Sequence, residues 1–245
     1  MSTASKPASN SSGAAPAAEN RMSFSRWFRE IGWRHVVGVV ALVFAAFPVL
    51  YVISASLNPL GTVASTGLIP TKVSLVNYQN LLSGVRGPFL RWYFNTIVIC
   101  AVVATAQVFL SLLGAYAFSR FRFTGRRGGL LALLLIMMFP AILSMIAIYT
   151  MISQIGQVVP AFGLNTLAGY SLALMGGALG QVWLIKGTFD TIPKSLDEAA
   201  ILDGCSHWQV FTKILLPSLK PILATTFLLA FVGIISEFLL GSIFL

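Results

Sequence analysis

The side chains of this sequence that could do chemistry are few, and most of the acidic ones fall in one polar segment. The sequence holds no G-x-x-x-x-G-K-[ST] phosphate-binding loop, no Ser-His-Asp arrangement, no paired carboxylates and no Cys or His spacing typical of a metal site. We therefore expect a chain that is not an enzyme, that carries no metal or cofactor of its own and that cannot hydrolyse ATP alone. Among the seven Asp and Glu residues, those of residues 188–220 are Asp190, Asp197, Glu198 and Asp203.

Glu237 is the one carboxylate inside a long apolar stretch, residues 221–240. If that stretch is a helix rising about 1.5 Å per residue, Glu237 lies roughly 24 Å beyond Pro221, close to one boundary of a membrane. An ionisable residue inside a membrane span is a candidate functional site. Glu237 would then contact a polar solute or pair with a partner subunit near a translocation path. The alternative is an interfacial carboxylate that reaches water.

The elements that would position these residues are membrane helices. Hydrophobic residues make up 57% of the chain and charged residues only 9%, whereas a soluble domain carries roughly 25% charged residues. Because lipid offers no partner for free backbone groups, we predict an all-α membrane protein, a polytopic helical bundle. The stretches long and apolar enough to cross a bilayer are residues 36–56, 93–118, 130–152, 167–185 and 221–240.

The distribution of Lys and Arg predicts the orientation of these helices. Of the 16 basic residues, only Lys72, Arg86 and Arg91 fall on the far side of the predicted helices, and all the others fall on the side of the N-terminus. Cytoplasmic loops carry the excess of Lys and Arg, so we predict a multi-pass protein of the cytoplasmic membrane with its N-terminus in the cytoplasm. The net charge of +9 follows from this bias, and nucleic-acid binding is not expected.

Residues 1–20 are rich in Ser, Ala, Pro and Asn and lack the apolar core of a signal peptide. We predict a disordered, basic cytoplasmic tail over residues 1–34 and a transmembrane domain over residues 35–245. Within that domain, Pro140 should bend the third helix, either shaping a pathway or merely kinking the span. The pair Gly176 and Gly180, supported by Ala173 and Gly177, has the small-xxx-small spacing that allows helices to approach closely in lipid.

Residues 188–220 are expected on the cytoplasmic side as two short amphipathic helices. Gly204 stands where the first helix would end in a left-handed residue, and Pro217 is expected to limit the second. Such a helix pair needs a surface to bury against, which its own bundle or another protein would supply. The predicted N-terminal caps are two capping boxes, Ser195 with Glu198 and Ser206 with Gln209.

The same segment contains the pattern EAA-x3-G-x9-I-x-LP, which resembles the EAA loop of permease subunits in the ABC transporter superfamily. Its defined residues are Glu198, Ala199, Ala200, Gly204, Ile214, Leu216 and Pro217. Other stretches are similar to the carbohydrate-uptake branch, namely residues 68–70, 77–78, 116–120 and 138–140. Residues 163–166 and 186–204 are similar to MalG-type subunits of maltose transporters. The resemblance covers residues 34–245.

This resemblance implies the membrane subunit of a binding-protein-dependent importer for maltose, maltodextrin or a related oligosaccharide. The motif residues would dock on a cytoplasmic ATPase dimer, which would bind the ATP. A second, MalF-like permease subunit and an extracytoplasmic sugar-binding protein would complete the assembly. Glu237 would hydrogen-bond sugar hydroxyls or pair with a partner. A permease for another sugar, an amino acid or a peptide, or a stand-alone secondary transporter, are the alternatives.

Subunits of this family have six membrane helices, and the sequence up to Leu245 predicts five. We therefore expect a fragment or a truncated product that lacks the last helix and the external loop before it. In MalG-type subunits that loop reaches toward the binding protein, so the resemblance assigns no residue to that contact here.

Overall fold

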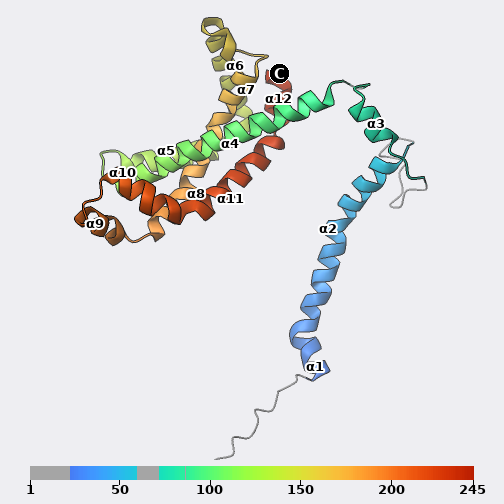
Figure 1. Ribbon diagram of the computed structural model, residues 1–245, viewed down its shortest axis with the longest axis horizontal. Helices are drawn as coiled ribbons and strands as arrows, with labels where there is room; N and C mark the ends of the chain where they lie inside the picture. The colour runs from blue at the N-terminus through green and yellow to red at the C-terminus, as the bar shows by residue number, and fades with distance from the viewer. Residues whose placement is uncertain (1–22, 60–71, 86) are drawn as a thin grey trace, which may run out of the picture. The chain divides into compact units, whose positions relative to one another are not determined.

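The computed structural model describes residues 23–59, 72–85 and 87–245, and every regular element in these ranges is a helix (Figure 1). The chain divides into two compact units, Met1–Gly87 and Pro88–Leu245. The all-helical membrane fold expected from composition is confirmed. The described helices that are long and apolar enough to cross a membrane are Ser25–Leu57, Phe89–Arg120, Leu167–Thr191 and His207–Ile235.

The first unit is one long apolar helix followed by a short one. We expected a disordered tail through residue 34, but the chain is already helical from Phe24; residues 1–22 lie outside the described part. The helix starts early because nothing in residues 24–34 breaks it, and Arg26 pairs with Glu30 one turn later at 2.9 Å. The elements are α1 (Phe24–Trp27), the π-helical η1 (Phe28–Gly32), α2 (Trp33–Leu57) and α3 (Val76–Leu82).

Asn77 and Tyr78, at the start of α3, tie that helix to the end of α2. The Asn77 amide donates to the carbonyls of Ser56 at 3.0 Å and Asn58 at 2.9 Å. The Tyr78 hydroxyl donates to Ser56 Oγ at 2.8 Å. The last carbonyls of a helix have no partner within it, so these two side chains close the C-terminal end of α2.

The second unit is built around α4 (Phe89–Arg120), which packs along α8 and α11 (Figure 1). The helices α5 and α6 together form the third predicted span, and they meet at an angle of 104° on either side of Pro140. The predicted bend is therefore confirmed, as a sharp break rather than a kink. The other elements are α5 (Arg126–Met138), α6 (Ala141–Val158), η3 (Pro160–Phe162), α7 (Leu167–Leu174), η4 (Met175–Gly177), α8 (Ala178–Thr191), α9 (Lys194–Leu202), α10 (His207–Gln209), η5 (Val210–Leu215), α11 (Leu216–Ile235) and α12 (Leu239–Phe244).

Polar side chains on α4 join it to a break in the fourth span. Between α7 and α8 the chain forms the 3-10 turn η4. In an α-helix the N–H of Ala178 would donate to the Leu174 carbonyl, but here it donates to the carbonyls of Met175 and Gly176. The Leu174 carbonyl is left for Gln107, whose Nε2 donates to it at 2.6 Å. Gln107 is only 4% exposed, so this bond satisfies a backbone group that water does not reach.

The close approach predicted for this stretch occurs at Gly177, one of the two supporting residues, and not at Gly176. A Cβ atom on Gly177 would lie 2.7 Å from Gln107 Nε2, whereas one on Gly176 would meet nothing within 4 Å. The prediction for Gly176 is therefore wrong. The 3-10 turn rotates the chain, so the helical spacing used for the prediction does not hold across it.

The fifth predicted span is longer than expected at its start. From His207 to Ile235 the helix runs without a break through α10, η5 and α11. The prediction that Pro217 limits a separate helix is therefore wrong. Pro217 follows the π-helical η5, whose wider hydrogen-bond spacing absorbs a residue that has no N–H to donate.

Glu237 lies in a short break after this helix and not within a continuous span, contrary to the prediction. The break separates Ile235, the last residue of α11, from α12. One carboxylate oxygen of Glu237, Oε1, accepts a hydrogen bond from the N–H of Leu240 at 2.9 Å. Since the first N–H groups of a helix lack partners within it, Glu237 stabilises the start of α12.

Candidate functional site

The polar segment forms a hairpin at one end of the second unit (Figure 1). We call residues 194–209, which comprise α9, the turn and α10, the α9–α10 hairpin. Gly204 has the predicted left-handed conformation, with φ at 85°. Its N–H donates to the Ile201 carbonyl at 3.0 Å, and the N–H of Cys205 donates to the Ala200 carbonyl at 2.9 Å. This pair of bonds is a Schellman motif, which requires a residue that tolerates positive φ.

Only one of the two predicted capping boxes is present. Ser206 Oγ accepts from the N–H of Gln209 at 3.3 Å, and Gln209 Oε1 accepts from the N–H of Ser206 at 2.8 Å. The prediction of a cap at Ser195 is wrong, because the N-cap of α9 is Pro193, two residues earlier. Pro193 holds Ile192 in an extended conformation, so the helix begins directly after the proline.

The residues of α9 divide between an inner and an outer face. Ala200 is buried and Asp197 is largely covered, at the i, i+3 spacing of one helical face. Glu198, Ala199 and Leu202 are exposed, and Leu202 is 88% exposed. The predicted site residues of the EAA motif are thus split, with Glu198 and Ala199 on the outside and Ala200 toward the bundle.

The inner face of the hairpin packs on an apolar cluster. Ala200 joins Phe189 of α8 with Phe211 and Leu215 of η5, and the Tyr116 ring of α4 lies 4.7 Å from the Phe211 ring. Of the remaining motif residues, Gly204 lies in the turn, and Ile214, Leu216 and Pro217 lie on the helix that follows it, in η5 and α11. Among them Ile214 and Leu216 are half-buried against the same cluster, while Gly204 and Pro217 are exposed.

An ion pair at the last turn of α4 holds the hairpin from its polar side. Arg120 Nε lies 2.7 Å from Asp197 Oδ2, with the two side chains 6% and 17% exposed. The same guanidinium donates from Nη2 to the Ile192 carbonyl at 3.1 Å. Arg120 therefore contacts both α9 and the extended link that precedes it.

A second polar contact joins α4 to α8 nearby. The Ser119 hydroxyl donates to Asp190 Oδ1 at 2.7 Å, and Lys186 Nζ lies 2.6 Å from Asp190 Oδ2. The contacts of Arg120 and Ser119 with Asp197 and Asp190 were not predicted from the sequence. The clustering of acidic residues in 188–220 indicated that they would need partners, but not which basic or hydroxyl side chains these would be.

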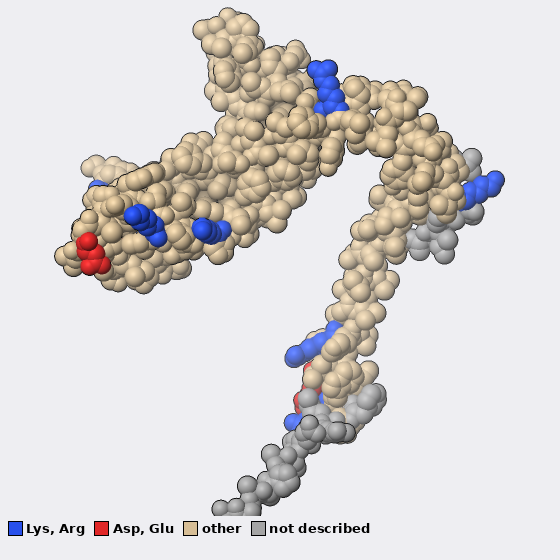
Figure 2. All heavy atoms as spheres, in the orientation of Figure 1, with Lys and Arg blue, Asp and Glu red and all other residues tan. Residues whose placement is uncertain are grey.

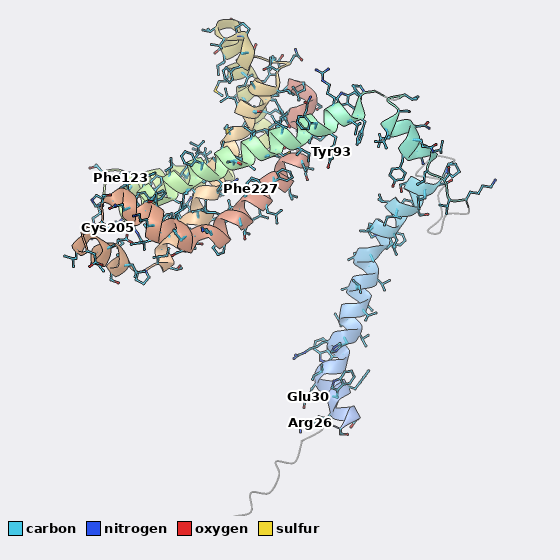
Figure 3. All side chains as sticks on the ribbon, viewed as in Figure 1. Arg26, Glu30, Tyr93, Phe123, Cys205 and Phe227 are labelled. Atoms are coloured by element: carbon cyan, nitrogen blue, oxygen red, sulfur yellow. The ribbon has the colours of Figure 1, made fainter. Side chains whose placement is uncertain are left out.

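The outer face of the hairpin combines large apolar side chains with a carboxylate. Leu196, Ile201 and Leu202 of α9 are exposed, and Trp208 of α10 is 69% exposed. Figure 2 shows acidic side chains at this end of the second unit with basic ones beside them, and Figure 3 shows Cys205 at the turn. Within the described ranges no group of His, Cys, Asp and Glu could hold a metal ion. The outer face thus presents exposed apolar side chains beside the Glu198 carboxylate.

Glu237 lines a cavity of about 790 Å³ that lies far along the bundle from the hairpin. Its wall is mostly apolar, with Gln107 and Gln181 contributing polar groups. The Gln181 amide donates from Nε2 to Gln107 Oε1 at 2.7 Å. The cavity therefore presents one carboxylate, an amide pair and Ser144 within an otherwise apolar lining.

Residues 81–245 match the family described as "Binding-protein-dependent transport system inner membrane component". The chain is 41% identical over 222 residues to the maltose/maltodextrin transport system permease protein MalG of Yersinia pestis, covering 86% of this chain and 73% of that protein. The protein of the same name from Escherichia coli strain K12 is 37% identical over 222 residues, covering 86% and 75%.

The fold is similar to a solved structure described as a bacterial ABC transporter involved in the import of the acidic polysaccharide alginate. The match has a TM-score of 0.68 and 27% identity, and covers 87% of this chain and 72% of that one. The sequence and fold comparisons therefore agree with the geometry of the bundle and its hairpin. This chain belongs to the family of inner-membrane components of binding-protein-dependent transport systems.

Proposed function

We propose that the chain is the MalG-like permease subunit of an ATP-driven importer for maltose, maltodextrin or a related oligosaccharide. Its α9–α10 hairpin docks onto a cytoplasmic ATPase dimer, which binds and hydrolyses the ATP. The observation that carries the docking role is the two-sided hairpin. Its inner face is packed on the bundle through Ala200, while Leu202 and Trp208 on the outer face are exposed.

The outer face has the chemistry of a protein interface. Large exposed apolar side chains mark sites of protein contact, and each helix of the hairpin carries one, Leu202 on α9 and Trp208 on α10. Glu198 adds a carboxylate and Ala199 a small side chain that permits close approach. These features fit a groove with an apolar floor and a basic rim on the partner. Ala200, Ile214 and Leu216 support this face from within the bundle, and Gly204 sets its turn.

The orientation of the chain and its other partner subunits are part of the same proposal. With the hairpin on the cytoplasmic side, the N-terminus is cytoplasmic too, in agreement with the excess of Lys and Arg on that side. A second, MalF-like subunit would cover the exposed apolar helices, and an extracytoplasmic binding protein would deliver the sugar. The sugar class rests on the names of the MalG relatives.

Glu237 would belong to the translocation path. It lines the cavity together with Gln107 and Gln181, and carboxylate and amide groups are the partners that sugar hydroxyls need. Its Oε1 already accepts from Leu240, so the second oxygen would be the one offered to a solute.

The test of docking compares two glycines that share a backbone conformation. Gly204 and Gly125 have φ of 85° and 89°, and a Cβ atom on either would meet nothing within 4 Å. Gly204→Asp should abolish uptake of labelled maltose with the subunit still inserted in the membrane, because it places a charge and a strained residue at the docking turn. Gly125→Asp carries similar strain outside the hairpin and should transport.

Normal uptake by Gly204→Asp would refute the docking role. The substrate is tested by comparing uptake of labelled maltose, trehalose and amino acids by the intact complex in membrane vesicles. Preferential uptake of an amino acid would overturn the sugar assignment and leave docking untouched.

A further inference from the structure

The chain attaches α9 to the membrane helices only weakly. At its start, α9 follows α8 through the extended residue Ile192 and Pro193. At its end, the left-handed Gly204 leads into α10. The first link is two residues outside regular helix and the second is four, residues 203–206, so neither continues α9 as a helix into α8 or into the helix that begins at His207.

The two arms of the hairpin therefore differ in how they could pass on a movement. The second arm is continuous with α11, since the helix runs unbroken from His207 to Ile235. A force on α10 is thus applied directly to a membrane span. A force on α9 reaches a span only through side-chain contacts, of which the Arg120 pair is the polar one.

From these observations we infer that Arg120 and Asp197 are positioning residues that make α9 move together with α4. This inference rests on the proposed docking of the hairpin to an ATPase. Arg120 is the last residue of α4, and its guanidinium contacts both Asp197 on α9 and the Ile192 carbonyl in the preceding link. Movement of α9 by the ATPase would then displace α4, the helix along which α8 and α11 pack.

The surroundings of the pair shield it from water. Both side chains are largely covered, and the Arg120 guanidinium also lies over the Phe189 ring, 5.9 Å from its centre. Charges shielded from water interact more strongly than exposed ones. Asp197 Oδ1 and Arg120 Nε each have no hydrogen-bond partner among the described residues, so the two side chains are held together by the attraction of their charges, and Arg120 is the group that compensates this carboxylate.

The adjacent carboxylates of Asp197 and Glu198 consequently have different roles. Asp197 faces α4, while Glu198 is exposed on the outer face. A substitution at Glu198 should weaken the grip of the ATPase on the hairpin. A substitution at Asp197 should leave binding of the ATPase to the hairpin intact and weaken the attachment of α9 to α4.

The experiment uses the whole importer, with its ATPase and binding protein, reconstituted in liposomes. The variants are Arg120→Gln, Asp197→Asn and the exchange of both residues, Arg120→Asp with Asp197→Arg. Arg122→Gln is the matched control, because it removes a nearby but exposed arginine. Three quantities are measured: the crosslink from Cys205 to the ATPase, sugar-dependent ATP hydrolysis, and sugar uptake.

Each single variant should keep the crosslink and ATP hydrolysis, while sugar taken up per ATP hydrolysed falls about fivefold or more, the lower end of typical coupling between sites. The exchange should restore part of that ratio, and Arg122→Gln should leave it unchanged. An unchanged ratio in Arg120→Gln, or loss of the crosslink in the single variants, overturns the inference. Absence of the crosslink in the unaltered protein instead removes the docking proposal on which it rests.

Discussion

The side-chain amide of Gln107 donates a hydrogen bond of 2.6 Å to the backbone carbonyl of Leu174, where the fourth span changes into a 3-10 turn. This contact joins the middle of α4 to the junction of α7 and α8. It holds a break inside the bundle that the uninterrupted apolar sequence of residues 167–185 does not show.

Gln107→Leu should lower the stability of the purified subunit by about 1–3 kcal/mol, because it leaves the buried Leu174 carbonyl without a donor. The control is Thr105→Ala on the same helix, where the exposed hydroxyl only bonds the Ala101 carbonyl within α4. Thermal unfolding in detergent compares the two. Equal melting temperatures for both variants would contradict the role given to Gln107.

Neighbouring glycines at the same turn should respond differently to a methyl group. Gly177→Ala places Cβ 2.7 Å from Gln107 Nε2, whereas Gly176→Ala meets nothing within 4 Å. Overpacking of a filled site costs about 1–3 kcal/mol, so Gly177→Ala should melt earlier and Gly176→Ala should not. The reverse order would show that the 3-10 turn is placed wrongly.

The two serines of the predicted capping boxes offer a similar comparison on the hairpin. Ser206→Ala should cost about 1 kcal/mol by removing the N-cap of the long helix. Ser195→Ala should have little effect, because Ser195 caps nothing. Hydrogen exchange of the first turn of α10 and of α9 measures each locally. Faster exchange in α9 for Ser195→Ala would restore the capping box that the structure lacks.

Glu237→Gln should lower sugar uptake about tenfold or more if the carboxylate binds the solute, since a hydrogen bond to a charged group is worth roughly 1.5–3 kcal/mol. The amide oxygen can still accept from Leu240, so α12 and the assembly should remain intact. Ser236→Ala, at an exposed neighbour, serves as the control. Normal transport by both Glu237→Gln and Glu237→Ala would remove Glu237 from the path.

Much of the fold was predictable because a helix that crosses lipid must be a long stretch of apolar residues, which is visible in the sequence. The apolar stretches predicted helices, and the excess of Arg and Lys on one side predicted an orientation. Gly204 was predictable as well, since a positive φ restricts the choice of residue locally. The apolar helices, their orientation and the turn at Gly204 each depend on residues close together in the sequence.

What could not be predicted has both local and long-range causes. The start of α9 was misplaced by two residues because Pro193 outweighs the Ser195 pattern, and Pro217 did not end a helix because the π-helical η5 just before it accommodates the proline. The pairing of Arg120 with Asp197 requires the packing of α4 on α8, which no local pattern encodes. Glu237 was placed in a span because hydropathy does not register the break after Ile235.

The most direct test of the account is whether Cys205 can be crosslinked to the ATPase in intact membranes. The chain has two cysteines, Cys205 and the buried Cys100. The variant Cys100→Ser therefore leaves Cys205 as the one thiol of this chain that a short bifunctional reagent can attack. The account predicts a crosslinked product of subunit and ATPase that is lost in Gly204→Asp. Labelling of Cys205 only by an impermeant thiol reagent applied to the outside of cells, with no product formed, would contradict it.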